Sequence, residues 1–267
     1  MTSASSNEPL HTSIVLNRLL QWHALVDQCR SREDHLVFLV HGTKEQDLHL
    51  FMERIRLYLS EECRVIHRVR SVQRTSDRTP ARSAEEWQRC LVKATQARSG
   101  ELDFVLAREA TTAPVLFLFA DADGPLRQLD EQAAGGLVRL LASRVSPALQ
   151  SLTAQKKLKN PVRFVIPIEH PPSDEAADPA VKVLASGLAS LAGLRLERVV
   201  ELGFPEWPDV LIHIERSHPA ADDAVRDACE KIHREIAASR DRSLMRLGNA
   251  LHDVLVASDE KGWYERE

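Results

Sequence analysis

A short segment near residue 42 carries residue types that could hold a phosphate group. The apolar run Leu36–Val40 leads to Gly42. Three polar residues follow closely: Thr43, Lys44 and Gln46. In a phosphate-binding loop of the pattern G-x-x-x-x-G-K-[ST], glycines turn backbone N–H groups toward the phosphates. The lysine contacts the terminal phosphates, and the hydroxyl residue holds magnesium. This segment is therefore the first candidate for chemistry.

The chemical positions of that pattern are altered in this chain. If Gly42 is the first glycine, the second glycine is replaced by Asp47, the lysine by Leu48 and the hydroxyl residue by His49. A carboxylate at position 47 would stand where a triphosphate has to lie. Lys44 precedes the expected helix, so it cannot take the usual role without a different backbone path. We expect no nucleotide hydrolysis, and hence no enzyme of this kind.

A second half of a nucleotide site would be a strand that ends in a magnesium-binding acid. The run Val115–Phe119 is followed by Asp121, which lies within one residue of the position where this pattern places the acid. Asp123 is a possible second acid. Many strands end in Asp for turn and capping reasons, so the structural interpretation of Asp121 is preferred. The vestigial nucleotide site would comprise Gly42, Thr43, Lys44, Gln46, Asp121 and Asp123. No cofactor and no metal ion are expected at it.

Two other kinds of chemistry stay open. In the first, Lys44, Asp121 and Asp123 handle the phosphates and the metal of a nucleotide-binding switch, with ATP or GTP and Mg²⁺ as cofactor. In the second, an unrelated enzyme uses strand-end groups, which are His41, Asp121, Glu169 and His170. The chain has no G-x-S-x-G nucleophile elbow, no H-E-x-x-H motif and no paired cysteine motif. Hydrolases of the α/β type and zinc sites are thereby excluded.

The elements that must position these groups alternate along the chain. Strands are predicted over 36–40, 64–69, 115–119, 162–168 and 196–202, with helical patterns between them. This alternation predicts an α/β fold: a three-layer P-loop-NTPase-like core of about five mostly parallel strands. The run 115–119 is apolar on both faces and belongs in the middle of the sheet. Ligands of such sheets bind at the carboxyl ends of the strands.

Helices are predicted before, between and after the strands. A leading helix covers 13–29, a long helix follows from residue 126 to 145, and closing helices cover 221–238 and 243–256. Ser83 and Glu86 are spaced as a capping box, and Asp209 is placed to cap a helix over 210–215. The expected organisation is a disordered segment 1–12, an α/β domain 13–215 and a C-terminal helical extension 216–267 packed on it.

Composition limits the partners and the compartment. The chain has 35 basic and 39 acidic residues, a net charge of −4, and 5% aromatic residues. This balance argues against nucleic acid and membrane partners. The basic segment 64–82 is either a solvated edge, which is preferred, or a patch for an acidic partner. The start of the chain is unlike a signal peptide, no run approaches a membrane span, and four unpaired cysteines suit a reducing compartment. We expect a cytoplasmic protein.

The combined pattern resembles a protein family. The residues that carry the resemblance are Val37–Gly42, Gln46-Asp47, Phe51, Arg54-Ile55, Trp87, Val115–Asp121 and Trp207–Val210. Together they look like the inactive STAND modules, which are degenerate relatives of the signal-transduction P-loop ATPases of bacterial conflict systems. The resemblance implies a non-catalytic sensing or scaffolding subunit of a bacterial defence or signalling system. Its partners would be proteins, such as a protease or effector from the same operon.

Overall fold

A computed structural model describes residues 35–62, 65–70, 80–97, 101–121, 124–127, 129–171, 178–239 and 242–264. Several expectations lie outside these residues. They are the segment 1–12, the leading helix 13–29, Asp123 and most of the basic segment 64–82.

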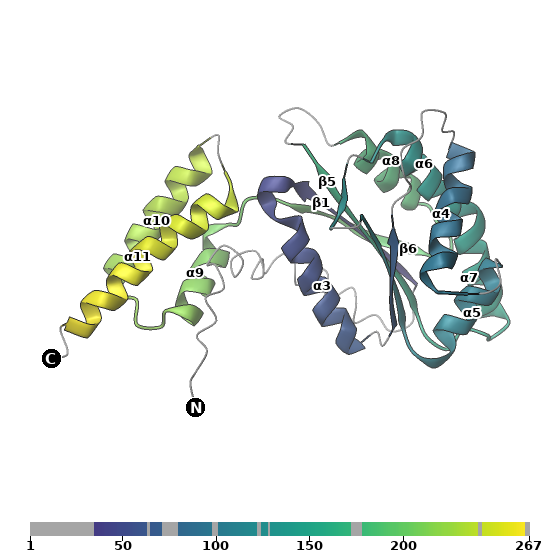
Figure 1. Cartoon of the computed structure of the whole chain (residues 1–267), viewed down its shortest axis with the longest axis horizontal. Helices are drawn as coiled ribbons and strands as arrows, with labels where there is room; N and C mark the ends of the chain where they lie inside the picture. Colours follow the sequence, from purple (N-terminus) through teal and green to yellow (C-terminus); the bar gives the residue numbers. More distant parts are fainter. Residues whose placement is uncertain are drawn as a thin grey trace.

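A largely parallel sheet forms the centre of the α/β part (Figure 1). Its strands are β1 (Leu36–Thr43), β2 (Val65–Arg70), β3 (Val115–Ala120), β4 (Leu126–Arg127), β5 (Val162–His170) and β6 (Arg195–Leu202). The order is β2-β3-β5-β1-β6, every one of these pairs is parallel, and the short β4 pairs with β5. The predicted α/β class with a parallel sheet is confirmed, and the layout is consistent with a three-layer, P-loop-NTPase-like fold. As predicted, β3 is an interior strand.

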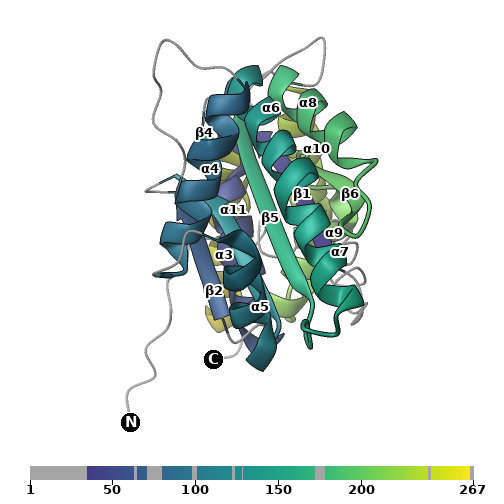
Figure 2. The same cartoon turned by 90° about the vertical axis from the view of Figure 1, so that its right-hand side faces the viewer.

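Alternate residues of each strand face different helices, because successive side chains of a strand point to opposite sides. In β1, Val37 and Leu39 pack with one set of helices, and Leu36, Phe38 and Val40 pack with α3 (Leu48–Glu62). The first set is α4 (Pro80–Ala94), α5 (Leu102–Thr112), α6 (Glu131–Leu140), α7 (Ser146–Ala154) and α8 (Pro179–Leu188). Figure 2 shows α6, α7 and α8 in front of the strands. The sheet is thus covered on both faces.

The long helix expected from residue 126 starts later. Residues Leu126–Arg127 form β4, and α6 begins at Glu131 after Asp130, whose side chain accepts a hydrogen bond from the N–H of Ala133 at 2.7 Å. A π-helical turn, Leu141–Val145, joins α6 to α7. Pro147 lies in the first turn of α7 and lacks the N–H of a regular helix, which accounts for a local change of helical type.

Two predicted caps are wrong. Because α4 begins at Pro80, Ser83 lies inside the helix, is fully buried and packs against Gly136 of α6. Likewise α9 begins at Trp207, so Asp209 lies in its first turn and is buried instead of preceding the helix. In both cases the helix starts earlier than its apolar periodicity indicates, at or next to a proline, which is favoured in the first turn.

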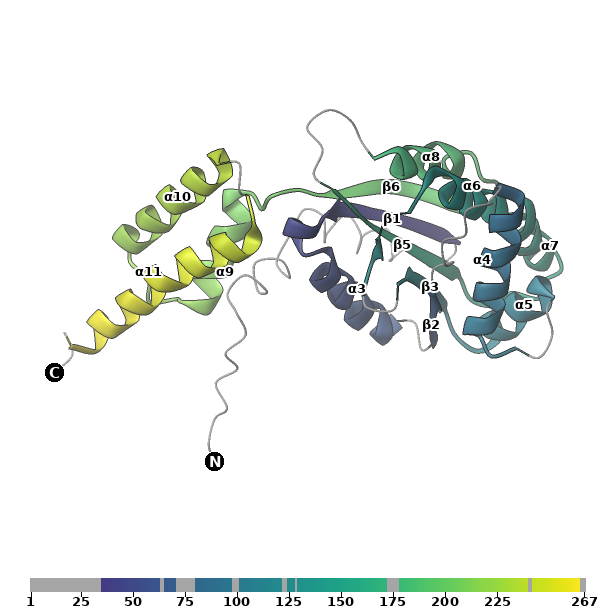
Figure 3. The same cartoon turned by 45° about the horizontal axis from the view of Figure 1, so that its top comes forward.

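The closing helices lie beyond the carboxyl end of β6 (Figures 1 and 3). They are α9 (Trp207–Ser217), α10 (Asp223–Ala238) and α11 (Leu244–Tyr264). The boundary expected at residue 215 falls inside α9, which lies with α10 and α11 in the figures. Helix α11 approaches the turn between β1 and α3. No helix among the described residues is both long enough and apolar enough to cross a membrane.

Candidate functional site

The connection from β1 to α3 is a tight turn. β1 runs to Thr43, three residues further than predicted, and Gly42 and Thr43 pair with Glu169 and His170 of β5. The prediction that these two residues belong to a loop is therefore wrong. Gly42 and Thr43 are residue types that are common in loops. Pairing of β1 with a strand on each side nevertheless keeps the backbone extended at least to Gly42. Only the four residues 44–47 are left to connect the strand to the helix.

Residues 44–47 form a closed turn. Lys44–Gln46 form a 3-10 turn, and Asp47 follows in the left-handed conformation (φ 47°, ψ 47°), with its N–H donated to the Lys44 carbonyl at 3.1 Å. Gln46 is buried, whereas Lys44 and Glu45 are exposed. A phosphate cradle needs successive N–H groups that point at one anion. This turn is shorter than the motif: the Asp47 N–H is used within it, and the Asp47 carbonyl accepts a hydrogen bond from the N–H of Phe51 at 3.4 Å.

Gly42 has a packing reason to be glycine. A Cβ atom at this position would lie 3.1 Å from Leu202 Cβ and 3.4 Å from the Leu202 carbonyl oxygen of the neighbouring strand β6. The missing side chain therefore permits close approach of β6. No phosphate is needed to explain it.

Leu48 and His49, which stand at altered positions of the phosphate-loop motif, make contacts within the fold. Leu48 is fully buried in the cluster beneath α3, and His49 is exposed. The ring of His49 lies beside Gly124, since a Cβ at Gly124 would be 3.3 Å from His49 Cδ2. Gly124 itself has φ +156°, a conformation that L-residues rarely adopt. The start of α3 thus contacts the loop that follows β3.

Asp121 closes that loop. Its Oδ2 accepts a hydrogen bond from the N–H of Arg127 at 2.8 Å, and its own N–H is donated to the Gly124 carbonyl at 2.9 Å. The Arg127 guanidinium continues the chain of contacts, with Nε 3.0 Å from Glu169 Oε1. Asp121 therefore holds the β3–β4 turn, in agreement with the structural interpretation of this residue. Sequence analysis does not single out Arg127, because a two-residue strand leaves no periodic signal.

Two histidines meet at the carboxyl ends of β1 and β5. His41 Nδ1 lies 3.2 Å from His170 Nε2, and His170 Nδ1 lies 3.0 Å from the Pro171 carbonyl oxygen. A carbonyl only accepts, so neutral His170 carries its proton on Nδ1, and its Nε2 accepts from His41 Nδ1–H. Burial lowers the pKa of His41; Glu201 opposes this effect and His170 adds to it. The lowered pKa therefore favours the neutral form of His41 in this pair.

The four strand-end groups proposed for an unrelated enzyme do not converge on one point. Glu169 and His170 are neighbours in β5 and so point to opposite faces of the sheet. His170 joins His41, whereas Glu169 is paired with Arg127. Asp121 is bonded to the backbone of Arg127. Within the part of the chain that the structure describes, no group of three or more His, Cys, Asp or Glu could hold a metal ion.

Sequence reasoning also missed a buried histidine in the closing helices. His233 of α10 is 7% exposed, its Nε2 donates a hydrogen bond to the Pro205 carbonyl at 2.8 Å, and its ring contacts the rings of Phe204 and Trp207. The ring centroids are 5.4 Å from Phe204 and 5.7 Å from Trp207. The only available signal was its place on the apolar face of an amphipathic helix. This contact fastens α10 to the segment that joins β6 to α9.

Comparison with known proteins adds little to these observations. No protein-family model matches the chain, and no curated protein matches it. Among solved structures, one similar chain comes from the "Structure of Drosophila ORC bound to GC-rich DNA and Cdc6". The identity is 10%, the TM-score is 0.31, and the match covers 90% of this chain and 44% of that chain. This chain thus spans less than half the length of that protein, and a likeness at this level carries no functional argument.

Proposed function

We propose that this protein is a non-catalytic, STAND-like module that binds partner proteins. The observation that carries the proposal is the β1–α3 connection, where a closed turn of four residues stands in place of a phosphate-binding loop. Gly42 and Thr43 are committed to β1, and Leu48 is committed to the core. The strand–turn–helix layout of a nucleotide site is present, while its phosphate-binding groups are replaced.

Two neighbouring features support the same proposal. Helix α11 lies close to the Lys44–Gln46 turn, in the region where a bound nucleotide would require space. The strand-end acid Asp121 accepts a hydrogen bond from the backbone N–H of Arg127, which gives this residue a structural role. A fold of this type that no longer turns over nucleotide can still act through its surface. The resemblance to inactive STAND modules supplies the expected setting: a cytoplasmic bacterial defence or signalling assembly, with a protease or other effector from the same operon as partner.

The test is a titration of the full chain with ATP and with GTP, each with Mg²⁺, by isothermal calorimetry. We expect no saturable heat at millimolar nucleotide and no release of phosphate in a parallel assay. Lys44→Ala and Asp121→Ala, with Lys93→Ala on the exposed face of α4 as a matched control, should all behave like the unchanged protein toward nucleotide.

The nucleotide-binding switch makes the opposite prediction. Saturable binding that is lost in Lys44→Ala and Asp121→Ala, but kept in Lys93→Ala, would replace the proposed module by a switch with an altered loop. Turnover of bound nucleotide would contradict the non-catalytic assignment outright.

A further inference from the structure

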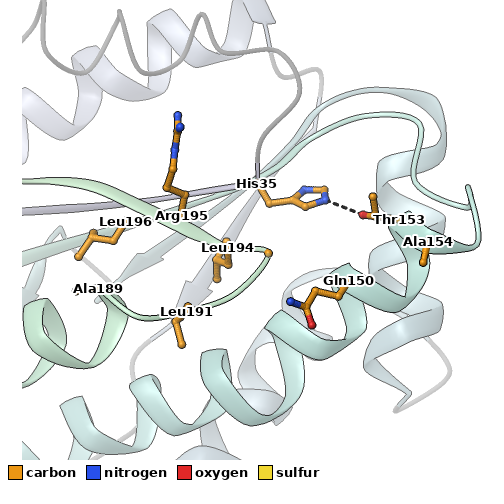
Figure 4. Close-up of a pocket in the computed structure, with 10 residues that line it drawn as sticks. His35, Gln150, Thr153, Ala154, Ala189, Leu191, Leu194, Arg195 and Leu196 are labelled. Carbon is orange, nitrogen blue, oxygen red and sulfur yellow. Dashed lines mark hydrogen bonds between the residues drawn. The ribbon is translucent and has the colours of Figure 1, made fainter.

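A cavity lies at the amino-terminal ends of the strands, opposite the β1–α3 turn. Its volume is about 660 Å³, within the range of small-molecule pockets. The walls come from the residue before β1, the end of α7, the end of α8 and the start of β6 (Figure 4). Because β1 begins here and the β1–α3 turn lies at its far end, this cavity is separate from the vestigial nucleotide site.

Part of the cavity wall is apolar. Ala154, Ala189, Leu191 and Leu194 line it, and no acidic residue is among the lining residues. Figure 4 shows Leu191 and Leu194 on the same side as Gln150, whereas the Arg195 side chain extends away from them. Burial of an aliphatic side chain of a ligand against this wall would remove apolar surface from water.

Polar groups are placed at the cavity in a defined protonation state. His35 Nδ1 accepts a hydrogen bond from the N–H of Val162 at 3.0 Å, so its Nε2 carries the proton that points to Thr153 Oγ1, 3.3 Å away. Thr153 accepts this bond, which leaves its own hydroxyl proton available to an acceptor on a ligand. The Gln150 amide has no hydrogen-bond partner among the described residues, and it offers both a donor and an acceptor. Such a pair suits the peptide groups of an extended segment.

A basic turn follows the cavity wall directly. The chain leaves α7 at Ala154 and turns through Lys156, Lys157 and Lys159, which are all exposed. The turn is fixed, because the N–H of Lys156 is donated to Thr153 O and that of Lys157 to Leu152 O, both at 2.9 Å. None of the three lysines forms an ion pair with a described residue. Exposed lysines without an ion-pair partner among the described residues thus follow the cavity-lining Ala154 within two to five positions of the chain.

From these observations we infer that the cavity is the docking site for an acidic segment of a partner protein, with an aliphatic side chain as its anchor. The apolar wall receives the anchor, Thr153 and Gln150 bind the peptide backbone, and the lysine turn attracts the flanking carboxylates. Electrostatic complementarity of this kind adds mainly to association rate and specificity. The inference goes beyond the proposed function, since it names a surface and a partner chemistry, and its test does not involve nucleotide.

The experiment uses the full chain and a fluorescein-labelled peptide in which leucines alternate with glutamates, followed by fluorescence anisotropy. We expect saturable binding that weakens with salt. Replacement of Lys156, Lys157 and Lys159 by alanine should weaken it about tenfold or more. Ala189→Trp and, separately, Ala154→Trp should abolish binding by filling the cavity; both positions are exposed, so the fold should tolerate them.

Matched controls separate docking from general charge attraction. The triple variant Arg89→Ala, Lys93→Ala and Lys231→Ala removes the same charge from exposed positions on α4 and α10, and it should bind like the unchanged protein. A peptide with alanines in place of leucines should bind at least about tenfold more weakly. The inference is overturned if the acidic peptide does not bind, if the control triple weakens binding equally, or if neither tryptophan variant has an effect. Circular dichroism of each variant verifies that it is folded.

Discussion

Asp121 and Arg127 are joined by a 2.8 Å hydrogen bond in which the arginine backbone N–H donates to the aspartate Oδ2. The Asp121 carboxylate, which the sequence offers as a candidate magnesium ligand, is here the acceptor that shapes a turn. The Arg127 side chain then pairs with Glu169 of β5. These two contacts connect the end of β3 to the end of β5.

Asp121→Ala should therefore affect stability. Loss of the carboxylate leaves the Arg127 N–H without this acceptor, at a cost of about 1 kcal/mol in the free energy of unfolding. Urea denaturation of the variant should show this decrease. Asp227→Ala, at an exposed position on α10, is the control and should change the free energy by less than about 0.5 kcal/mol. Equal stability of the two variants would argue against a structural role for Asp121.

The crossing of α4 and α6 depends on Gly136. A Cβ at this position would overlap Ser83 Cβ, so Gly136→Ala should destabilise the protein by about 1–3 kcal/mol despite the better helix propensity of alanine. The double variant Gly136→Ala with Ser83→Gly should recover part of the loss in a double-mutant cycle. Gly203→Ala, where the added Cβ has nothing within 4 Å, is the matched control and should be close to neutral. Additive effects at 83 and 136 would contradict the predicted clash.

His213 should make stability depend on pH. Burial, with a smaller contribution from His218, lowers its pKa from 6.5 to about 4. The unfolded chain then binds more protons than the folded chain in this range, so stability is full above pH 6.5 and falls as the pH decreases toward 4. The loss should approach roughly 3 kcal/mol.

Urea titrations at several pH values measure this dependence. His213→Gln should have a flatter profile than the unchanged protein between pH 6.5 and 4, while His252→Gln, at an exposed position on α11, should retain the original slope. His41, whose pKa is also lowered, contributes in the same direction, so the difference between profiles is the informative quantity. Parallel profiles for all three proteins would refute the assignment.

His233 should hold the closing helices to the end of β6. His233→Ala loses the bond to the Pro205 carbonyl and the ring contacts with Phe204 and Trp207, and we expect about 2 kcal/mol of destabilisation. Tryptophan fluorescence should also change, because Trp207 lies against the removed ring. His252→Ala provides the comparison on α11 and should leave both properties unchanged. An unaltered melting temperature in His233→Ala would show that the contact adds nothing.

The sequence predicted β1, β3 and β5 well because each contains a mostly apolar run. The run Val115–Phe119 corresponds to β3 with one residue added, and 162–168 corresponds to β5 with two added. The extension of β1 to Thr43 could not be predicted, since it depends on pairing with β5 and β6, whose residues lie far along the chain. The same holds for β4, which is too short to leave a pattern.

The candidate site was harder to predict than the fold. Composition and spacing identified His41 and His170 as strand-end residues, but only the register of β1 and β5 brings them together. The alternation of side chains along β5 separates Glu169 from His170, because adjacent residues of a strand face opposite sides of the sheet. Ser83 was misinterpreted for a similar reason: its spacing to Glu86 fits a cap, while its actual contact is with a glycine on another helix. Contacts between distant segments are invisible to local patterns.

The apolar cluster beneath α3 has a consequence for how the protein unfolds. Leu48 and Phe51 of α3 belong to the same buried cluster as Leu247 and Leu251 of α11. A chain cut at Gly203 would lose the helices that complete this cluster and expose part of its apolar surface to water. The sheet and the closing helices should therefore melt in a single cooperative transition, and a fragment that stops before α9 should aggregate instead of folding by itself.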